Sequence, residues 1–130
     1  MVINMIARTL KNEKRPIALL IDREARSAKE MLAHRLQGTP HVTLIGETSA
    51  GAVLPANFFD LPGGAKLMIP NQRGDSEILP FMKNQKLEGR GAVPDVNVLF
   101  YLPFKAGTDP ILDEAIQVLT RQLSGDLLRI

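Results

Sequence analysis

The sequence predicts an α/β domain in which two buried parallel strands are joined by a short helix. Two short runs, at 16–22 and 41–46, have the continuous apolar character typical of strands buried on both faces of a parallel sheet. Between them, residues 27–37 favour a helix, and Gly38 and Pro40 end it. A helix of this length can cross over between neighbouring parallel strands, which gives the order β-α-β.

The rest of the chain predicts a β meander and a C-terminal helix. Residues 47–56 are expected to form a loop at the carboxyl end of the second strand. The segments NFFDL and AKLMIP flank Pro-Gly-Gly, a turn signal, so we expect them to form a hairpin or meander. The run NVLFYL, residues 97–102, is expected to be a last strand. Residues 108–123 are expected to be a helix, because Thr108 or Asp109 can cap an apolar stripe.

Length and composition limit the class of protein. The chain has 130 residues, of which 45% are apolar, and this is enough for one domain with a real core. No apolar run approaches the roughly 20 residues that span a bilayer, so no membrane span is expected. There is no cysteine, which excludes disulfides and thiolate metal sites. The two histidines, His34 and His41, are too few for most zinc sites.

The charge is uneven along the chain, although the net charge is only +2. Residues 1–35 carry eight Lys and Arg against four Asp and Glu, a balance that can indicate nucleic-acid binding. However, no aromatic residue precedes Phe58, so this basic segment has no platform on which bases could stack. We therefore expect a solvated charged face and no nucleic-acid partner.

Ser27 lies where the first strand gives way to the helix. Ligands of open α/β sheets bind beyond the carboxyl ends of the strands, so a serine at this place points into the usual site. The N–H of Ala28 could donate to an oxyanion while Ser27 attacks a carbonyl. The alternative is that Ser27 only caps the helix, because serine is a favoured N-cap residue. Taken alone, this stretch favours the cap.

Four segments resemble one family of proteases in their order and spacing. RSAKEMLAHRL, VTLIGETSAGAV, LEGRGAVPDVNV and GTDPILDEAIQVL are similar to the catalytic domain of the C-terminal processing, or tail-specific, serine peptidases. The closer similarity is to the branch that contains the tricorn core protease and the interphotoreceptor retinoid-binding protein. It runs from about Pro16 to about Leu123. The resemblance implies a crotonase/ClpP-like core, hydrolysis of peptide bonds through an acyl-enzyme, and neither a metal nor an organic cofactor.

The resemblance also implies roles for individual residues. Ser27 matches the nucleophile, and Ala28 matches the residue whose amide forms half of the oxyanion hole. Glu88 matches an acidic position that, in the tricorn-like branch, helps to organise the charge-relay side chains. Gly51 matches the loop beside the site and is expected to contact substrate. Arg26, which flanks the site together with Arg23, could hold a substrate carboxylate, with solvated surface as the simpler interpretation.

A general base is missing from these matches. In the processing-peptidase branch the base is a lysine 25 residues after the serine, and that position is Ala52 here. In the tricorn-like branch it is a histidine far upstream, and no histidine precedes Ser27. His34 and His41 are not expected to replace it, because both should lie too far from the serine. A serine hydroxyl without a base is a weak nucleophile.

The chain is therefore expected to be a single domain, residues 1–130, that carries the nucleophile half of a peptidase domain whose upstream part is missing. The base would be a histidine on that segment. Expected partners are a peptide or protein substrate and either a second copy of the chain or the upstream domain of the same protein, because a half-domain exposes apolar surface and a sheet edge. The sequence leaves the cellular compartment open.

Two other functions remain possible from the sequence. The first is a non-catalytic binding module of the same fold that holds a peptide or an apolar ligand, and the second is a fragment that only oligomerises. The binding module would use apolar side chains for which core packing is the default interpretation. These are Phe58, Phe59, Leu61, Leu67, Met68, Phe81 and Met82.

Overall fold

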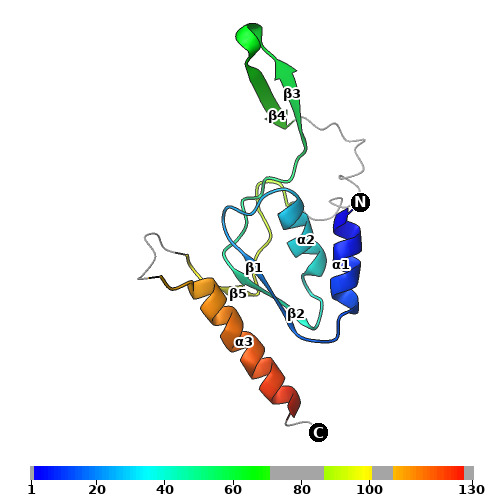
Figure 1. Ribbon diagram of the computed structural model, residues 1–130, viewed down its shortest axis with the longest axis vertical. Coiled ribbons are helices and arrows are strands. Elements are labelled where there is room, and N and C mark those ends of the chain that lie inside the picture. Colours follow the sequence, from blue (N-terminus) through cyan, green and yellow to red (C-terminus); the bar gives the residue numbers. More distant parts are fainter. Residues whose placement is uncertain (1, 71–86, 101–106, 128–130) are drawn as a thin grey trace.

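The computed structural model describes residues 2–70, 87–100 and 107–127 (Figure 1). The elements are α1 (Val2–Asn12), β1 (Ile17–Ile21), α2 (Ala28–Leu36), β2 (Val42–Gly46), β3 (Ala56–Asp60), a 3₁₀ turn (Pro62–Gly64), β4 (Lys66–Pro70), β5 (Val96–Asn97) and α3 (Pro110–Leu127). The predicted α/β class is confirmed. None of the helices in the described part of the chain combines the length and apolarity that a bilayer crossing requires.

The central sheet is parallel and has the order β1-β2-β5. Ile17 pairs with Val42 and Ile21 pairs with Gly46, so β1 and β2 run side by side over their whole length. Because α2 connects these two strands, the predicted β-α-β crossover is confirmed. Both strands therefore end at the same edge of the sheet, and the residues that follow β1 and β2 meet there.

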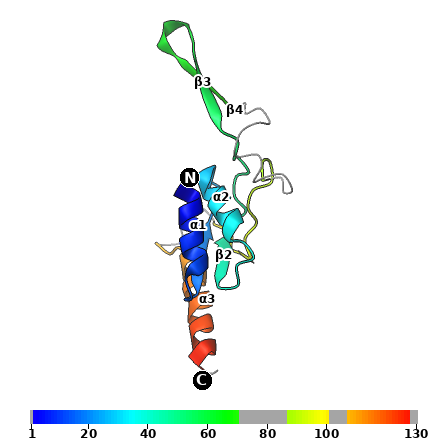
Figure 2. The ribbon, with the colours of Figure 1, turned by 90° about the vertical axis from the view of Figure 1, so that its right-hand side faces the viewer.

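Each face of the sheet carries its own apolar cluster. On one face Leu44 of β2 packs with Met31 and Leu36 of α2 and with Ala7 of α1. On the other face its neighbour Ile45 packs with the α3 residues Ile111, Ala115 and Val118. This alternation follows from the period of two along a strand. The sheet is thus sandwiched between α1 with α2 on one side and α3 on the other (Figures 1 and 2).

The first helix, α1, was not expected from the sequence. Its inward residues Ile3, Ala7 and Leu10 follow helical spacing and pack against the cluster formed by α2 and the sheet. A single helix of 11 residues is marginal in water, so its stability comes from packing rather than from local preference.

The last strand is shorter than expected. β5 covers only Val96 and Asn97 instead of 97–102, although the N–H of Val98 still donates to Gly46 O at 2.8 Å. Residues 101–106 lie outside the described residues. Just before β5, the side chain of Asp95 takes the place of a backbone acceptor for β2. Its carboxylate accepts the Leu44 N–H at 2.8 Å.

The predicted hairpin and the predicted cap of the last helix are both present. β3 and β4 pair antiparallel from Ala56–Pro70 to Asp60–Lys66, and the hairpin extends away from the rest of the chain (Figures 1 and 2). In α3 the Asp109 carboxylate accepts the N–H of Ile111 at 3.0 Å and of Leu112 at 3.1 Å.

Candidate active site

Ser27 has a strained backbone at the turn between β1 and α2. Its φ is 57° and its ψ is −122°, and it is the only described residue other than glycine with a positive φ. An N-cap residue normally has an extended backbone, so capping alone does not require this conformation. Such strain costs about 1–3 kcal/mol and persists only where the surroundings impose it. An exposed serine on a sharp strand-to-helix turn is the arrangement that presents a nucleophile in other hydrolase folds.

The strain is imposed by two hydrogen bonds from the backbone N–H of Ser27. This N–H lies 2.9 Å from the carbonyl oxygen of Ala52 and 3.2 Å from Oε2 of Glu30. The second bond is the half of a capping box in which the glutamate side chain accepts the N–H of the N-cap residue. The first contact joins the serine to the loop that follows β2, and the second joins it to a side chain one helical turn further on. The turn is therefore fixed from two directions.

Glu30 is the centre of this network and is fully buried, with an exposed fraction of 0%. Its Oε1 accepts from Ser49 Oγ at 2.5 Å and from the Gly51 N–H at 2.6 Å. Its Oε2 accepts from the Ala52 N–H at 2.8 Å in addition to Ser27. A buried carboxylate is tolerated only when hydrogen bonds replace its water, and Glu30 has four donors. This one side chain holds the loop 49–52 against the serine.

Sequence reasoning missed both Glu30 and its partner Ser49. The visible signal was the Ser-x-x-Glu spacing, which is also an ordinary helix start. Ser49 is buried, and its Oγ accepts the Ala92 N–H at 2.7 Å while donating to Glu30. The network thus extends from α2 to the segment before β5.

Gly51 lies inside the network rather than on its surface. It is buried, its N–H donates to Glu30, and its carbonyl accepts the Gly89 N–H at 2.7 Å. Its φ is 70°, and a Cβ added here would lie 2.7 Å from the backbone nitrogen of Arg90. Only glycine allows the two loops to approach so closely. The expected contact between Gly51 and substrate stays a prediction.

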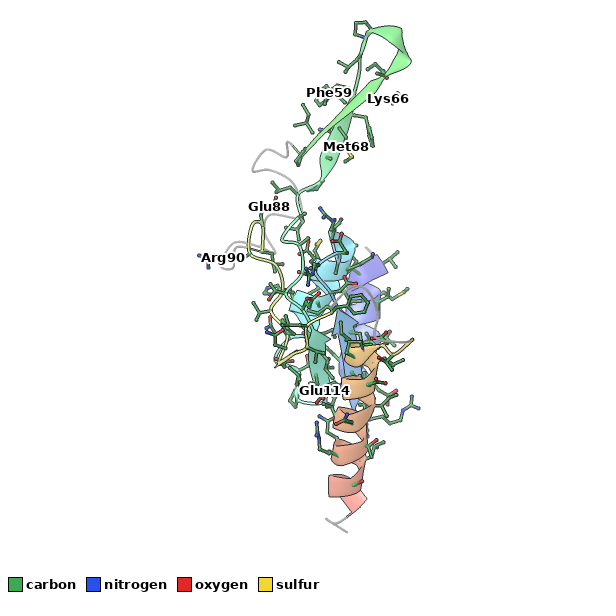
Figure 3. The ribbon with its side chains drawn as sticks, turned by 90° about the vertical axis from the view of Figure 1, so that its left-hand side faces the viewer. Phe59, Lys66, Met68, Glu88, Arg90 and Glu114 are labelled. Atoms are coloured by element: carbon green, nitrogen blue, oxygen red, sulfur yellow. The ribbon has the colours of Figure 1, made fainter. Side chains whose placement is uncertain are left out.

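Glu88 supports the same loop one residue beyond Ala52. Its Oε2 accepts the N–H of Val53 at 2.8 Å and of Leu54 at 3.0 Å. Figure 3 shows Glu88 at the base of the β3–β4 hairpin. The side chain reaches the serine turn through the backbone of the loop, and its expected part in a charge relay stays a prediction.

The two arginines that flank the site differ in their surroundings. Arg23 holds the buried Glu47 with two hydrogen bonds, Nε to Oε2 at 3.0 Å and Nη2 to Oε1 at 2.5 Å. These bonds lower the pKa of the Glu47 carboxyl, although burial acts in the opposite direction. Arg26 is exposed, and its Nη2 lies 3.6 Å from the Glu24 carboxylate. Of the two, Arg26 has the looser contacts for an arginine that would hold a substrate carboxylate.

Neither histidine lies beside Ser27. His41 precedes β2, and its Nε2 lies 2.9 Å from the carbonyl oxygen of Leu10 in α1. Because β1 and β2 are parallel and five residues long, this position is about 17 Å from the edge that carries Ser27. His34 lies in the last turn of α2, about 10 Å along the helix axis from the serine. Ala52, by contrast, has its backbone bonded to Ser27 and offers only a methyl group.

The family of the chain follows from a match to a family model. The model of peptidase family S41 matches residues 4–98. The chain belongs to peptidase family S41. The predicted tail-specific peptidase family is thereby confirmed, and no curated protein sequence matches the chain.

Solved structures share the fold of the S41 chain. The tricorn protease is 23% identical over 84% of this chain and 10% of its own, with a TM-score of 0.65. A candidate peptidase from Parabacteroides merdae is 24% identical over 82% of this chain and 32% of its own, with a TM-score of 0.57. A lipoprotein from Streptococcus agalactiae is 23% identical over 85% of this chain and 33% of its own, with a TM-score of 0.53. The S41 chain spans a third or less of each, and the crotonase/ClpP-like fold is confirmed.

Proposed function

We propose that this S41 chain carries the nucleophile of a serine peptidase. The observation that carries the proposal is the strained, exposed Ser27 at the carboxyl end of a parallel strand. Ser27 Oγ attacks the carbonyl carbon of a peptide bond and gives its proton to a base. The amine leaves with that proton, and water then hydrolyses the ester that remains on Ser27.

The start of α2 supplies stabilisation for the oxyanion. Ala28 is the first residue of the helix, where backbone N–H groups have no partner within the helix and the helix dipole is positive. Its N–H donates to the oxyanion that forms during attack by its neighbour Ser27. Glu30 and Glu88 act as positioning residues, because they hold the loop around Ala52 and do not contact the reacting atoms.

The base is proposed to come from another polypeptide segment. His34 and His41 are too distant, and position 52 carries alanine. A histidine brought close to Ser27 Oγ by an additional segment or chain would complete the site. The same segment would also supply a second N–H donor for the oxyanion, because Ala28 supplies one donor at the described site.

The experiment that tests this proposal adds a base at position 52. Ala52 O accepts the Ser27 N–H at 2.9 Å, so the two residues are adjacent and a lysine side chain at 52 is long enough to span the distance to the hydroxyl. We expect Ala52→Lys to accelerate labelling of Ser27 by a fluorophosphonate by about 10²–10⁴-fold, the usual contribution of a general base. The acceleration should grow with pH as the amine loses its proton.

Two controls make the result specific. Ala50→Lys places the same side chain in the same loop, at a residue of similar half-buried exposure, and should leave labelling slow. Ser27→Ala in the Ala52→Lys background should abolish labelling. Equal labelling of both lysine variants, or none in a folded Ala52→Lys protein, would count against a nucleophilic Ser27 and favour a binding module.

A further inference from the structure

The β3–β4 hairpin exposes large apolar side chains beside the candidate site. Phe58 is 66% exposed and Met68 is 60% exposed, and every strand residue except Ala56 is exposed. The hairpin starts four residues after Ala52, so its base lies within about 14 Å of the serine turn. A two-stranded hairpin is marginally stable in water, whereas three or more strands with an apolar face are stable. The hairpin therefore gains stability from additional strands.

The two outer edges of the hairpin are not equally protected. β4 contains Lys66 and Pro70, and lysine and proline are the residues that discourage pairing at an edge. β3 has neither proline nor lysine, and its only charge is Asp60 at its last position. Among the described residues, β3 pairs only with β4, and its outer edge is the less protected of the two.

The register shows which backbone groups of β3 point outward. The Leu61 N–H donates to Ala65 O at 2.8 Å, which makes this pair, next to the turn, a hydrogen-bonded one. Hydrogen-bonded and non-hydrogen-bonded pairs alternate along an antiparallel ladder. The Phe58–Met68 pair, three positions further along the ladder, is therefore a non-hydrogen-bonded pair. The N–H and C=O of Phe58 consequently point away from β4. Pro70 and Ala56 also form a non-hydrogen-bonded pair, so the missing N–H of Pro70 removes no hydrogen bond between β3 and β4.

We propose that β3 pairs antiparallel with β3 of a second copy of this chain, about a two-fold axis at Phe58. The two Phe58 residues then exchange their outward N–H and C=O groups, and the two hairpins become one four-stranded sheet. Such a contact uses the same surface of both copies and closes with two chains.

The charges of the hairpin fit this self-pairing. With Phe58 opposite Phe58, Asp60 of each copy lies opposite Ala56 of the other, so the two carboxylates are at opposite ends of the interface. Each Asp60 is already paired with Lys66, 2.6 Å away on the neighbouring strand (Figure 3 labels Lys66). No like charges meet across the axis. Two strands of five residues each are expected to bury less than the roughly 1,600 Å² of a standard interface, so we expect a reversible dimer.

Two proline variants of the 130-residue chain test the edge. Phe58→Pro removes the outward N–H of β3, and Met68→Pro removes the equivalent N–H of β4, so neither takes a bond from the hairpin itself. By sedimentation velocity over a concentration series, we expect the wild type and Met68→Pro to dimerise. We expect Phe58→Pro to have a dissociation constant at least about tenfold higher, because carbonyls at the interface lose their donors.

A cross-linking pair keeps the proposal testable if a proline perturbs the hairpin. The chain has no cysteine, so Phe58→Cys and Met68→Cys each introduce a single thiol. Under mild oxidation Phe58→Cys should form a disulfide-linked dimer across the axis, and Met68→Cys should stay monomeric. A wild type that is monomeric at every concentration, or equal behaviour at positions 58 and 68, would overturn the proposal.

Discussion

Replacing Glu30 by glutamine tests whether one buried carboxylate holds the serine turn. The carboxylate accepts four hydrogen bonds, two at each oxygen. A glutamine has one oxygen and one NH₂ group, so whichever way it is placed, two donors face a nitrogen that cannot accept. The less costly orientation directs the NH₂ toward Ser49, whose hydroxyl can turn and accept. The N–H of Gly51 then has no acceptor.

The magnitude follows from these contacts. An unsatisfied buried donor costs about 1–3 kcal/mol, and the remaining bonds weaken by about 1 kcal/mol because they lose a charged acceptor. We therefore expect Glu30→Gln to lower the free energy of unfolding by about 2–4 kcal/mol, measured by urea denaturation at neutral pH. In the Ala52→Lys background, the rate of Ser27 labelling should fall as well.

A matched control separates this effect from loss of charge alone. Glu24 is exposed and 3.6 Å from Arg26, so Glu24→Gln should change stability by less than about 0.5 kcal/mol. If Glu30→Gln were as stable as the wild type, the four hydrogen bonds of Glu30 would not be what holds the serine turn.

Two further predictions concern the backbone of Ser27 and the Arg23–Glu47 pair. Ser27→Gly should be about 1 kcal/mol more stable than Ser27→Ala in urea denaturation, because glycine adopts a positive φ without strain, and both should lose fluorophosphonate labelling; equal stability would argue against strain at this position. The pKa of Glu47 is lowered in the folded chain, so the stability from its pairing is complete above the ordinary value of 4.5 and is lost as the pH falls through the lowered pKa. Glu47→Gln should therefore have a lower melting temperature at neutral pH, and its melting temperature should fall less steeply than that of the wild type as the pH is lowered. The same pH dependence of the melting temperature in variant and wild type would contradict the assigned Arg23–Glu47 pairing.

The sequence predicted those parts of the fold that depend on local patterns. The apolar runs of β1 and β2, the helix between them and the Pro-Gly-Gly turn each have a short-range signature. The helix α1 was missed although Ile3, Ala7 and Leu10 follow helical spacing, and a helix of 11 residues is stable only when it packs against other elements. The strand expected at 97–102 ends at Asn97 within the described residues, because an apolar run does not show where its pairing partner ends.

Some features of the candidate site could likewise be predicted from local sequence patterns, and others could not. The place of Ser27 at the sheet edge follows from the order of strand and helix, so it could be predicted. Its positive φ could not, because that angle is imposed by Ala52 and Glu30 together. Glu30 gave a signal that a plain helix start explains equally well, and its true partners lie about 20 residues further along the chain. The base that the proposed function requires could not be located, because neither histidine is near Ser27.

The hydrogen bonds of Glu30 also affect the order in which the chain folds. They join α2 to the loop 49–52, and Ser49 carries them on to Ala92, which is 65 positions after Ser27. Contacts between such distant segments require closure of long loops, so we expect them to form after the local contacts of α2. A chain in which α2 has formed but the loop 49–52 has not yet docked lacks the hydrogen bond from the Ser27 N–H to Ala52 O, one of the two contacts that impose the strained turn. The strained backbone of Ser27 is thus a product of tertiary contacts, and we expect it to be absent from partly folded chains that have only local structure.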